Sequence, residues 1–172
     1  LMQSPERVAD CCAAMAGAQP RPVTVKCRIG VDDQIPEEVL PEFLSRIIAA
    51  GCIRVSIHAR KAWLQGLSPK ENREVPPLDH DLVVRMKAAF PHLRIAINGG
   101  ITTLDEAEGF LALGLDRVMI GRAAYHGPAM LGAVDRRIFG EDGPDVTPEA
   151  AVAEIWGHVP FPAGGSGGSG ST

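Results

Sequence analysis

The chain has 172 residues, of which 45% are hydrophobic, and its formal net charge is -4 at pH 7. This length and composition allow one globular domain with a hydrophobic core. No run of about eighteen apolar residues and no signal-peptide pattern occurs, so nothing indicates a membrane or exported protein, and we expect a cytoplasmic one. A negative net charge also argues against a general nucleic-acid coat, so any RNA contact must come from a local cationic patch.

The cysteines give no sign of a metal centre. Cys11, Cys12, Cys27 and Cys52 form no CxxC pair, and no histidine stands at metal-ligand spacing from them. This usage is typical of reduced, buried small residues in a cytosolic protein. The sequence therefore predicts no metal site.

The first expected elements are a helix over residues 1–15 and a strand over residues 22–30. The helix has a plausible N-cap at Ser4 and a proline in its first turn. Along the strand, alternation places Lys26 and Arg28 on one face. On an antiparallel sheet these cations would face solvent, whereas in a parallel barrel, where both faces are covered, they would need a charged partner.

The rest of the chain alternates between helical and strand patterns. The expected elements are a helix from near Pro41 to Gly51, a strand ending at His58, a helix capped by Asp79 and stopped by Pro91, a strand over 93–98, a helix opened by the capping box at Thr103, a strand over 116–121, a helix from Pro128 through Ile138, and a helix from Pro148 to about Trp156.

A polar loop of about twenty residues follows His58, which is long for a compact domain and therefore indicates function. Four cations and an aromatic residue in one loop suit an anionic, planar ligand such as a phosphate, a nucleotide or RNA. A solvated loop without a ligand is the alternative. The side chains concerned are Arg60, Lys61, Trp63, Lys70, Asn72 and Arg73.

Strands that alternate with helices predict a parallel sheet with right-handed crossovers, either doubly wound or a (β/α)8 barrel. No GxGxxG motif follows the first strand, which argues against a dinucleotide fold. Polar residues instead stand at the carboxyl ends of the strands, where barrel enzymes build their sites. The predicted class is α/β, the second half of a barrel, with about four βα units that leave two strand edges unpaired.

The expected division of the chain has three parts. Residues 1–140 form the partial barrel and residues 141–163 a helical extension. Residues 164–172 have the composition of a flexible Gly/Ser linker or tag and are left out of the fold prediction.

Five motifs in this order resemble the tRNA-dihydrouridine synthases. They are Val25-Lys-Cys-Arg-Ile-Gly30, Ile57-His-Ala-Arg-Lys-Ala-Trp-Leu64, Gly66-Leu-Ser-Pro-Lys-Glu-Asn-Arg73, Ile97-Asn-Gly-Gly-Ile101 and Met119-Ile-Gly-Arg122. The long loop is similar to that of the A-type enzymes, which modify positions 20 and 20a of the tRNA D-loop. The resemblance covers roughly residues 1–140.

This resemblance implies a flavin-binding TIM barrel followed by a helical RNA-binding domain. NADPH reduces FMN, which delivers a hydride to the uracil C5–C6 bond while a cysteine acts as proton donor. By resemblance, Lys26 contacts the flavin ring, and His58 contacts the flavin or its phosphate side. The phosphate would be held by Asn98, Gly99, Gly100, Gly121 and Arg122, and tRNA by Arg60, Lys61, Lys70 and Arg73.

The sequence also departs from the family pattern. The loop with the proton-donor cysteine, the first four strands and the RNA-binding domain have no counterpart here, so no catalytic residue is assigned. We expect the chain to be inactive alone and to pair with itself or with a complementary half-barrel. Two alternatives stay open: another FMN barrel, such as a dihydroorotate- or enoate-reducing enzyme, and a non-catalytic half-barrel scaffold with a residual phosphate site.

Overall fold

The computed structural model describes residues 1–158. The expected Gly/Ser linker and the last residues of the expected helical extension lie outside this part. The chain divides into two compact units, the first of which is Leu1–His126, and the second begins at Gly127. The sequence placed the end of the barrel portion at residue 140, and that functional division stays a prediction.

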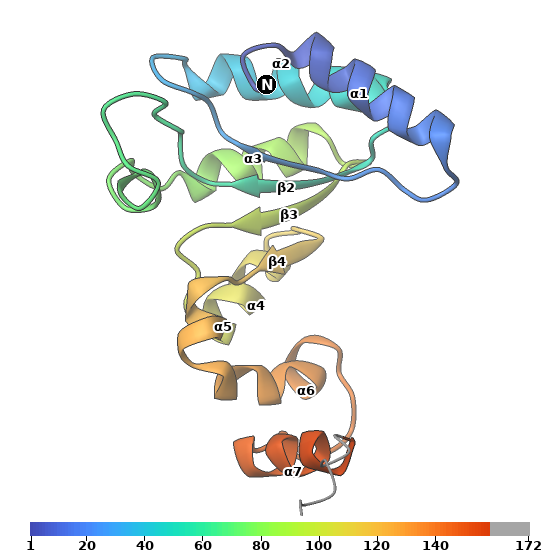
Figure 1. Ribbon diagram of the computed structural model, residues 1–172, viewed down its shortest axis with the longest axis vertical. Coiled ribbons are helices and arrows are strands. Elements are labelled where there is room, and N and C mark those ends of the chain that lie inside the picture. The colour runs from blue at the N-terminus through green and yellow to red at the C-terminus, as the bar shows by residue number, and fades with distance from the viewer. Residues whose placement is uncertain (159–172) are drawn as a thin grey trace, which may run out of the picture. The chain divides into compact units, whose positions relative to one another are not determined.

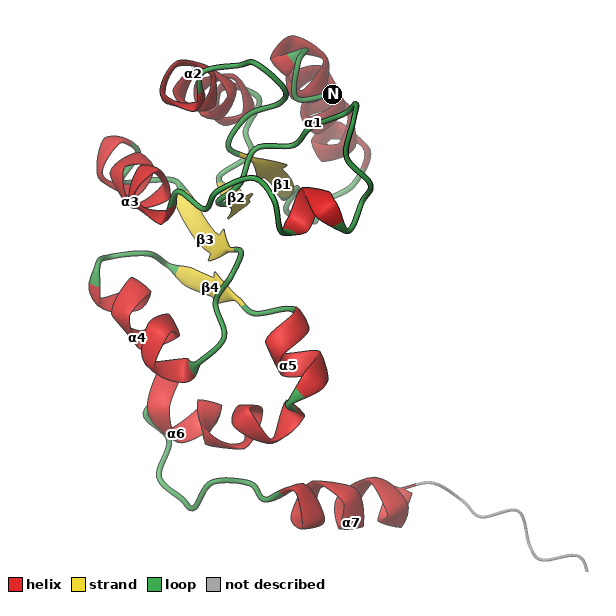
Figure 2. Cartoon of the chain, turned by 90° about the vertical axis from the view of Figure 1, so that its left-hand side faces the viewer, coloured by secondary structure: helices red, strands yellow, loops and turns green. Residues whose placement is uncertain are grey.

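The first unit is built on one parallel sheet. Its strands are β1 (Val25–Arg28), β2 (Arg54–His58), β3 (Arg94–Asn98) and β4 (Arg117–Met119), which pair in chain order (Figure 1 for β2 to β4 and Figure 2 for all four). Parallel neighbours need a crossover connection, and α2 (Pro36–Ala49), α3 (His80–Ala89) and α4 (Leu104–Ala112) supply it. The predicted α/β class is confirmed, and the sheet is consistent with part of a TIM barrel.

The hydrophobic core lies between one face of this sheet and the helices. On β2, Val55 and Ile57 are buried, while the alternate residues Arg54, Ser56 and His58 are only partly buried. They pack with fully buried side chains of α2 and α3 such as Leu44 and Leu82. Each such side chain contributes about 1.5–3 kcal/mol when it leaves water. Polar strand residues consequently share the opposite face.

Two predicted helix starts are confirmed by hydrogen bonds. The Asp79 carboxylate accepts from the Leu82 amide at 2.8 Å, which caps α3. At α4, the Thr103 hydroxyl accepts from the Glu106 amide at 3.2 Å, and the Glu106 carboxylate accepts from the Thr103 amide at 3.1 Å. At α1 (Pro5–Ala18), Ser4 is the N-cap residue as expected, but its side chain makes no capping bond.

The predicted start of α2 is wrong. The helix begins at Pro36 rather than near Pro41, which lies inside it. A proline suits the first helical turn, where its missing N–H would have no partner, and Pro36 takes that place. The helix continues past the second proline to Ala49, and the carbonyl of Pro41 accepts from the Ser45 hydroxyl at 2.8 Å.

The segment after β4 also differs from the prediction. A short helix, α5 (Arg122–His126), ends the first unit. In the second unit, the helix expected from Pro128 through Ile138 is two pieces, a 3₁₀ helix η2 (Pro128–Ala133) and α6 (Val134–Ile138). Helix α7 (Pro148–His158) begins at the expected proline.

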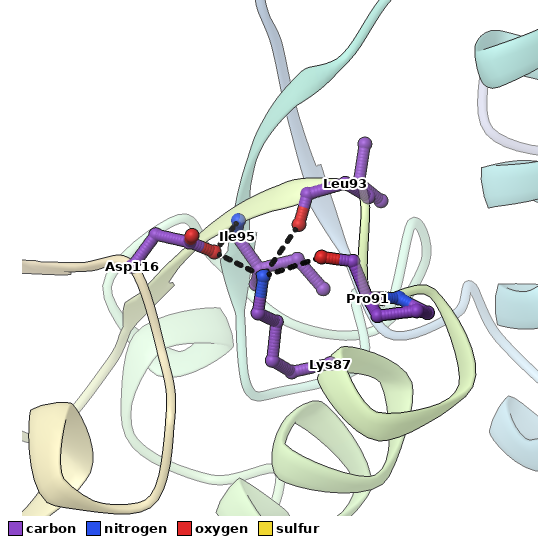
Figure 3. A network of polar contacts seen from close by, with 5 residues as sticks. All are labelled: Lys87, Pro91, Leu93, Ile95 and Asp116. Atoms are coloured by element: carbon purple, nitrogen blue, oxygen red, sulfur yellow. Dashed lines mark hydrogen bonds and ion pairs between the residues drawn. The ribbon is translucent and has the colours of Figure 1, made fainter.

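A polar network ties the amino ends of β3 and β4 to α3 (Figure 3). The Lys87 ammonium donates to the carbonyls of Pro91 and Leu93 and pairs with Asp116 at 2.8 Å. The Asp116 carboxylate also accepts from the Ile95 amide at 2.9 Å. Burial alone would raise the pKa of Asp116, but the bonds from Lys87 and Ile95 and the Lys87 charge lower it. This network fixes the end of the sheet opposite the candidate site.

No helix within the described residues is long and apolar enough to span a membrane.

Candidate functional site

A cavity of about 500 Å³ opens at the carboxyl ends of the four strands. The loop after β2 and helix α5 lie at this same edge of the sheet, toward which the β3 and β4 arrowheads point (Figure 2). All seven residues expected to hold the cofactor line the cavity: Lys26, His58, Asn98, Gly99, Gly100, Gly121 and Arg122. Parallel strands end at one edge, so the topology brings these distant segments together.

The lining of the cavity is cationic. Lys26, Arg28, Arg73 and Arg122 contribute to it, and no aspartate or glutamate does among the residues described. One carboxylate lies beside it, that of Glu74, whose Oε1 is 3.0 Å from Arg122 Nη1. Because this pair is about half exposed, it is weak, and an anionic ligand could replace the carboxylate. The cavity is therefore suited to an anion.

His58 is neutral in this setting. Burial lowers its pKa to about 4, helped by the nearby positive charges of Arg28, Lys26, Arg60 and Arg122. Its Nδ1 atom is buried and has no hydrogen-bond partner. A buried polar atom without a partner is costly, so this nitrogen is a fitting contact for a polar atom of a ligand.

A chain of hydrogen bonds orients Lys26 of β1 toward β3. Lys26 Nζ donates to Asn98 Oδ1 at 3.3 Å, and Asn98 Nδ2 donates to the Met119 carbonyl at 2.8 Å. The side-chain amide of Asn98 therefore connects the Lys26 ammonium on β1 to the end of β4. Two of the residues expected at the flavin, Lys26 and Asn98, are in direct contact.

The turn after β3 needs its two glycines. Gly99 and Gly100 have φ values of 112° and 73°, which side-chain-bearing residues rarely adopt. A Cβ at Gly100 would also collide with Leu78. His80 at the start of α3 fixes the turn from outside, since its Nε2 lies 2.7 Å from the Gly99 carbonyl oxygen. Gly121 has no positive φ, and nothing lies within 4 Å of its Cβ position.

Arg28 fastens the long loop to the sheet. Its Nη1 donates to the carbonyls of Lys61 at 2.9 Å and Asn72 at 2.8 Å. Burial and the charges of Arg60 and Arg73 lower the pKa of Arg28, although a guanidinium stays charged at neutral pH. The loop contains a short 3₁₀ helix, η1 (Glu71–Arg73), that the sequence did not predict.

Asn72 joins the two arms of this loop. Its side-chain oxygen accepts from the Trp63 amide and its nitrogen donates to the Trp63 carbonyl, both at 2.7 Å. The loop is thus held by side-chain bonds to its own backbone.

The four cations expected at tRNA lie in different surroundings. Arg60 binds the backbone of its own loop, because its Nη1 donates to the carbonyls of Glu74 and Pro76. Lys61 lies 5.3 Å from the Trp63 ring centroid, a cation–π distance. Lys70 is exposed just before η1. Arg73 lines the cavity, so the structure does not separate it from the expected cofactor residues.

Sequence reasoning assigned no role to Glu74, Leu78 or His80. It placed Arg28 beside Lys26 on one strand face, at the carboxyl end of the strand, but did not include it among the expected cofactor residues. The contacts of Glu74 with Arg122 and of His80 with Gly99 join residues 48 and 19 positions apart. No local pattern marks such pairs, and only the folded chain shows them.

The expectation of four buried cysteines is wrong at Cys11, which is exposed, whereas Cys12, Cys27 and Cys52 are buried. Cys11 and Cys12 are consecutive on α1, so they point in different directions, and one of them turns toward the core. Burial raises the pKa of the Cys27 thiol to about 12, which makes it inert. All four are free, and none of them lines the cavity.

Within residues 1–158, no three His, Cys, Asp or Glu side chains are grouped so that they could hold a metal ion.

A parallel α/β sheet whose strand ends surround an anion site is the arrangement of barrel enzymes. The family model described as dihydrouridine synthase matches residues 1–158, and the chain belongs to this family. This membership decides against the other flavin barrels considered from the sequence.

Several bacterial relatives bear the name tRNA-dihydrouridine(20/20a) synthase. The protein of Pasteurella multocida is 50% identical over 159 residues, which is 92% of this chain and 48% of the relative. Those of Escherichia coli K12 and Vibrio parahaemolyticus are 50% identical over 160 residues, again 92% of this chain, and 46% and 49% of the relatives. The chain therefore spans about half the length of the curated relatives it matches.

Proposed function

We propose that this protein takes part in the reduction of uridine to 5,6-dihydrouridine in the tRNA D-loop, at positions 20 and 20a. FMN would occupy the cavity at the strand ends, with NADPH as reductant. The observation that carries this proposal is a cavity whose lining, among residues 1–158, has four cations and no carboxylate. The relatives named tRNA-dihydrouridine(20/20a) synthase support the substrate. A tRNA substrate agrees with the expected cytoplasmic location.

The residues present fit this cofactor. The cavity volume of about 500 Å³ lies in the range of ligand pockets, roughly 300–1,000 Å³. Arg122 can bind a phosphate through two parallel N–H groups, and the Gly99–Gly100 turn lets the backbone come close to it. His58 offers a buried ring nitrogen that lacks a partner. When bound, FMN supplies the hydride chemistry.

The protein's own groups would bind, orient and stabilise charge. A lysine ammonium next to the flavin ring stabilises the negative charge of its reduced form, and Asn98 holds Lys26 for that task. Neutral His58 adds no further positive charge to the cavity. On the outside, Lys61 and Lys70 give the loop the positive charge that attracts an RNA backbone.

Removal of the Arg122 guanidinium tests the proposed site. A titration of residues 1–172 with FMN, followed by flavin fluorescence, should show that Arg122→Ala weakens binding about tenfold or more. A hydrogen bond to a charged group contributes roughly 1.5–3 kcal/mol, and about 1.4 kcal/mol is a factor of ten. Arg7→Ala, which removes an exposed arginine of α1, is the matched control and should bind as the wild type does.

The variant Glu74→Gln shows whether Arg122 acts on FMN affinity directly or only through its ion pair with Glu74. If Arg122 binds the ligand, loss of the competing carboxylate should leave FMN affinity unchanged or increase it. Equal weakening by Arg122→Ala and Glu74→Gln would instead show that the pair only shapes the loop. A wild-type chain without FMN affinity would contradict the cofactor site and favour the non-catalytic scaffold.

A further inference from the structure

The peptide that joins Gly99 to Gly100 lies between the cavity and α3. Both glycines line the cavity, and both have a positive φ. Because a glycine has no Cβ, the peptide between two glycines can rotate with little steric cost. Rotation by half a turn would exchange the directions of the Gly99 carbonyl and the Gly100 amide. The chain must therefore fix this peptide if one of the two groups is to face a ligand.

His80 fixes the peptide through its carbonyl group. The Nε2 atom of His80 lies 2.7 Å from the Gly99 oxygen. Since a carbonyl oxygen only accepts hydrogen bonds, Nε2 carries the hydrogen and donates it. The His80 ring is held in turn by Phe110 of α4, against which it packs edge to face with the ring centroids 4.9 Å apart.

The backbone next to His80 anchors this donor to the sheet. The Asp79 amide donates to the Ala59 carbonyl at 2.8 Å, and the Ala59 amide donates to the Asn98 carbonyl at 2.9 Å. Ala59 directly follows β2, and Asn98 is the last residue of β3. The donor and the turn that it binds are therefore anchored to the same two strand ends.

The geometry of a peptide then sets the direction of the Gly100 amide. No peptide bond among the described residues is cis, and in a trans peptide the C=O and N–H groups point in opposite directions. With the Gly99 carbonyl directed at His80, the Gly100 N–H points away from α3, to the side of the cavity. Within residues 1–158, no acceptor takes this N–H. It is consequently a donor that a ligand can use.

We propose that His80 is a positioning residue, which aims the Gly100 amide at the phosphate of the ligand and thereby strengthens the preference for a phosphorylated flavin. An N–H donor bonds strongly to a charged oxygen. If the peptide turned over, the Gly99 carbonyl oxygen would face the phosphate and repel it. His80 itself does not line the cavity, so it acts through the peptide. The inference rests on the proposed flavin site and deepens it.

Two substitutions separate the hydrogen bond of His80 from its packing. His80→Phe keeps a ring against Phe110 and removes the donor. It should lower the FMN affinity of residues 1–172 about fivefold, the effect of one hydrogen bond, and leave riboflavin affinity unchanged. His80→Gln removes the ring but keeps an N–H donor, so most of the preference for FMN should remain.

A purely structural role would give a different pattern. If His80 served only the packing of the fold, His80→Gln would be the more damaging change, and the affinities for both flavins would fall together. His92→Phe changes an exposed histidine that does not line the cavity, and it should leave both affinities unchanged.

Inorganic phosphate tests the inference without the flavin. In NMR spectra of the backbone amides, phosphate should shift the Gly100 signal of the wild type and of His80→Gln, and this shift should be lost in His80→Phe. The same shift in His80→Phe as in the wild type, or an undiminished preference of His80→Phe for FMN, would overturn the role of His80 and leave the flavin site standing.

The phosphate titration also tells failure of this inference from failure of the proposed function. If the phosphate shift depends on His80 but the wild type binds no FMN, the flavin proposal fails and the role of His80 at a phosphate stands. A wild type whose Gly100 amide responds to neither phosphate nor FMN would overturn the inference.

Discussion

His58 shows how the surroundings of one residue set its chemistry. Its folded-state pKa of about 4 lies below the ordinary value of 6.5 because burial and four nearby cations oppose protonation. The unfolded chain takes up a proton as the pH falls through 6.5, whereas the folded chain does so only near pH 4. Protonation of His58 therefore favours the unfolded state between these values.

This shift predicts a specific loss of stability in acid. The free energy of unfolding should fall between about pH 6.5 and pH 4, and His58→Gln should remove that part of the loss. Urea unfolding at several pH values measures it, with His92→Gln, at an exposed histidine after α3, as the control. An NMR titration showing that His58 protonates near its ordinary value would contradict the account. A bound anion should raise its pKa.

At the scale of elements, the long loop joins the cavity to the outer surface. Arg28 and Arg60 hold its backbone, while Lys70 is exposed. Lys70→Ala should therefore weaken tRNA binding and leave FMN affinity unchanged. The slope of log affinity against log salt should become shallower by about 0.7–0.9, the value of one phosphate contact.

Arg73→Ala is the informative comparison for this loop. Because Arg73 lines the cavity, its loss should affect FMN as well as tRNA, whereas Arg7→Ala should affect neither. Filter binding over a range of salt concentrations measures the slopes. If Lys70→Ala binds tRNA normally with an unchanged slope, the loop does not contact the substrate.

The sequence predicted elements best where local chemistry decides them. The capping residues of α3 and α4 were identified because the side chain and the amide it caps are three residues apart. The predicted start of α2 was wrong because Pro36 and Pro41 both fit the first turn of a helix, and the sequence alone does not decide between them. The short helix η1 was missed because three residues give no periodicity.

At the scale of the whole molecule, the parallel topology explains why the predicted cofactor residues converge. Their order along the chain, together with the rule that parallel strands end at one edge, was enough to predict that all seven line one cavity. The position of the Glu74 carboxylate beside that cationic cavity could not be predicted from the sequence. The pairing of Arg122 with Glu74 depends on how the long loop folds back, which no local motif describes.

A comparison of FMN with riboflavin, which lacks the phosphate, tests the central claim most directly. Titrations of residues 1–172, followed by flavin fluorescence, should show FMN bound at least tenfold more tightly than riboflavin. In Arg122→Ala most of this difference should disappear, because the phosphate has lost its cationic partner. Equal affinity of the wild type for FMN and riboflavin, or an undiminished preference for FMN in Arg122→Ala, would contradict a phosphate site at the strand ends.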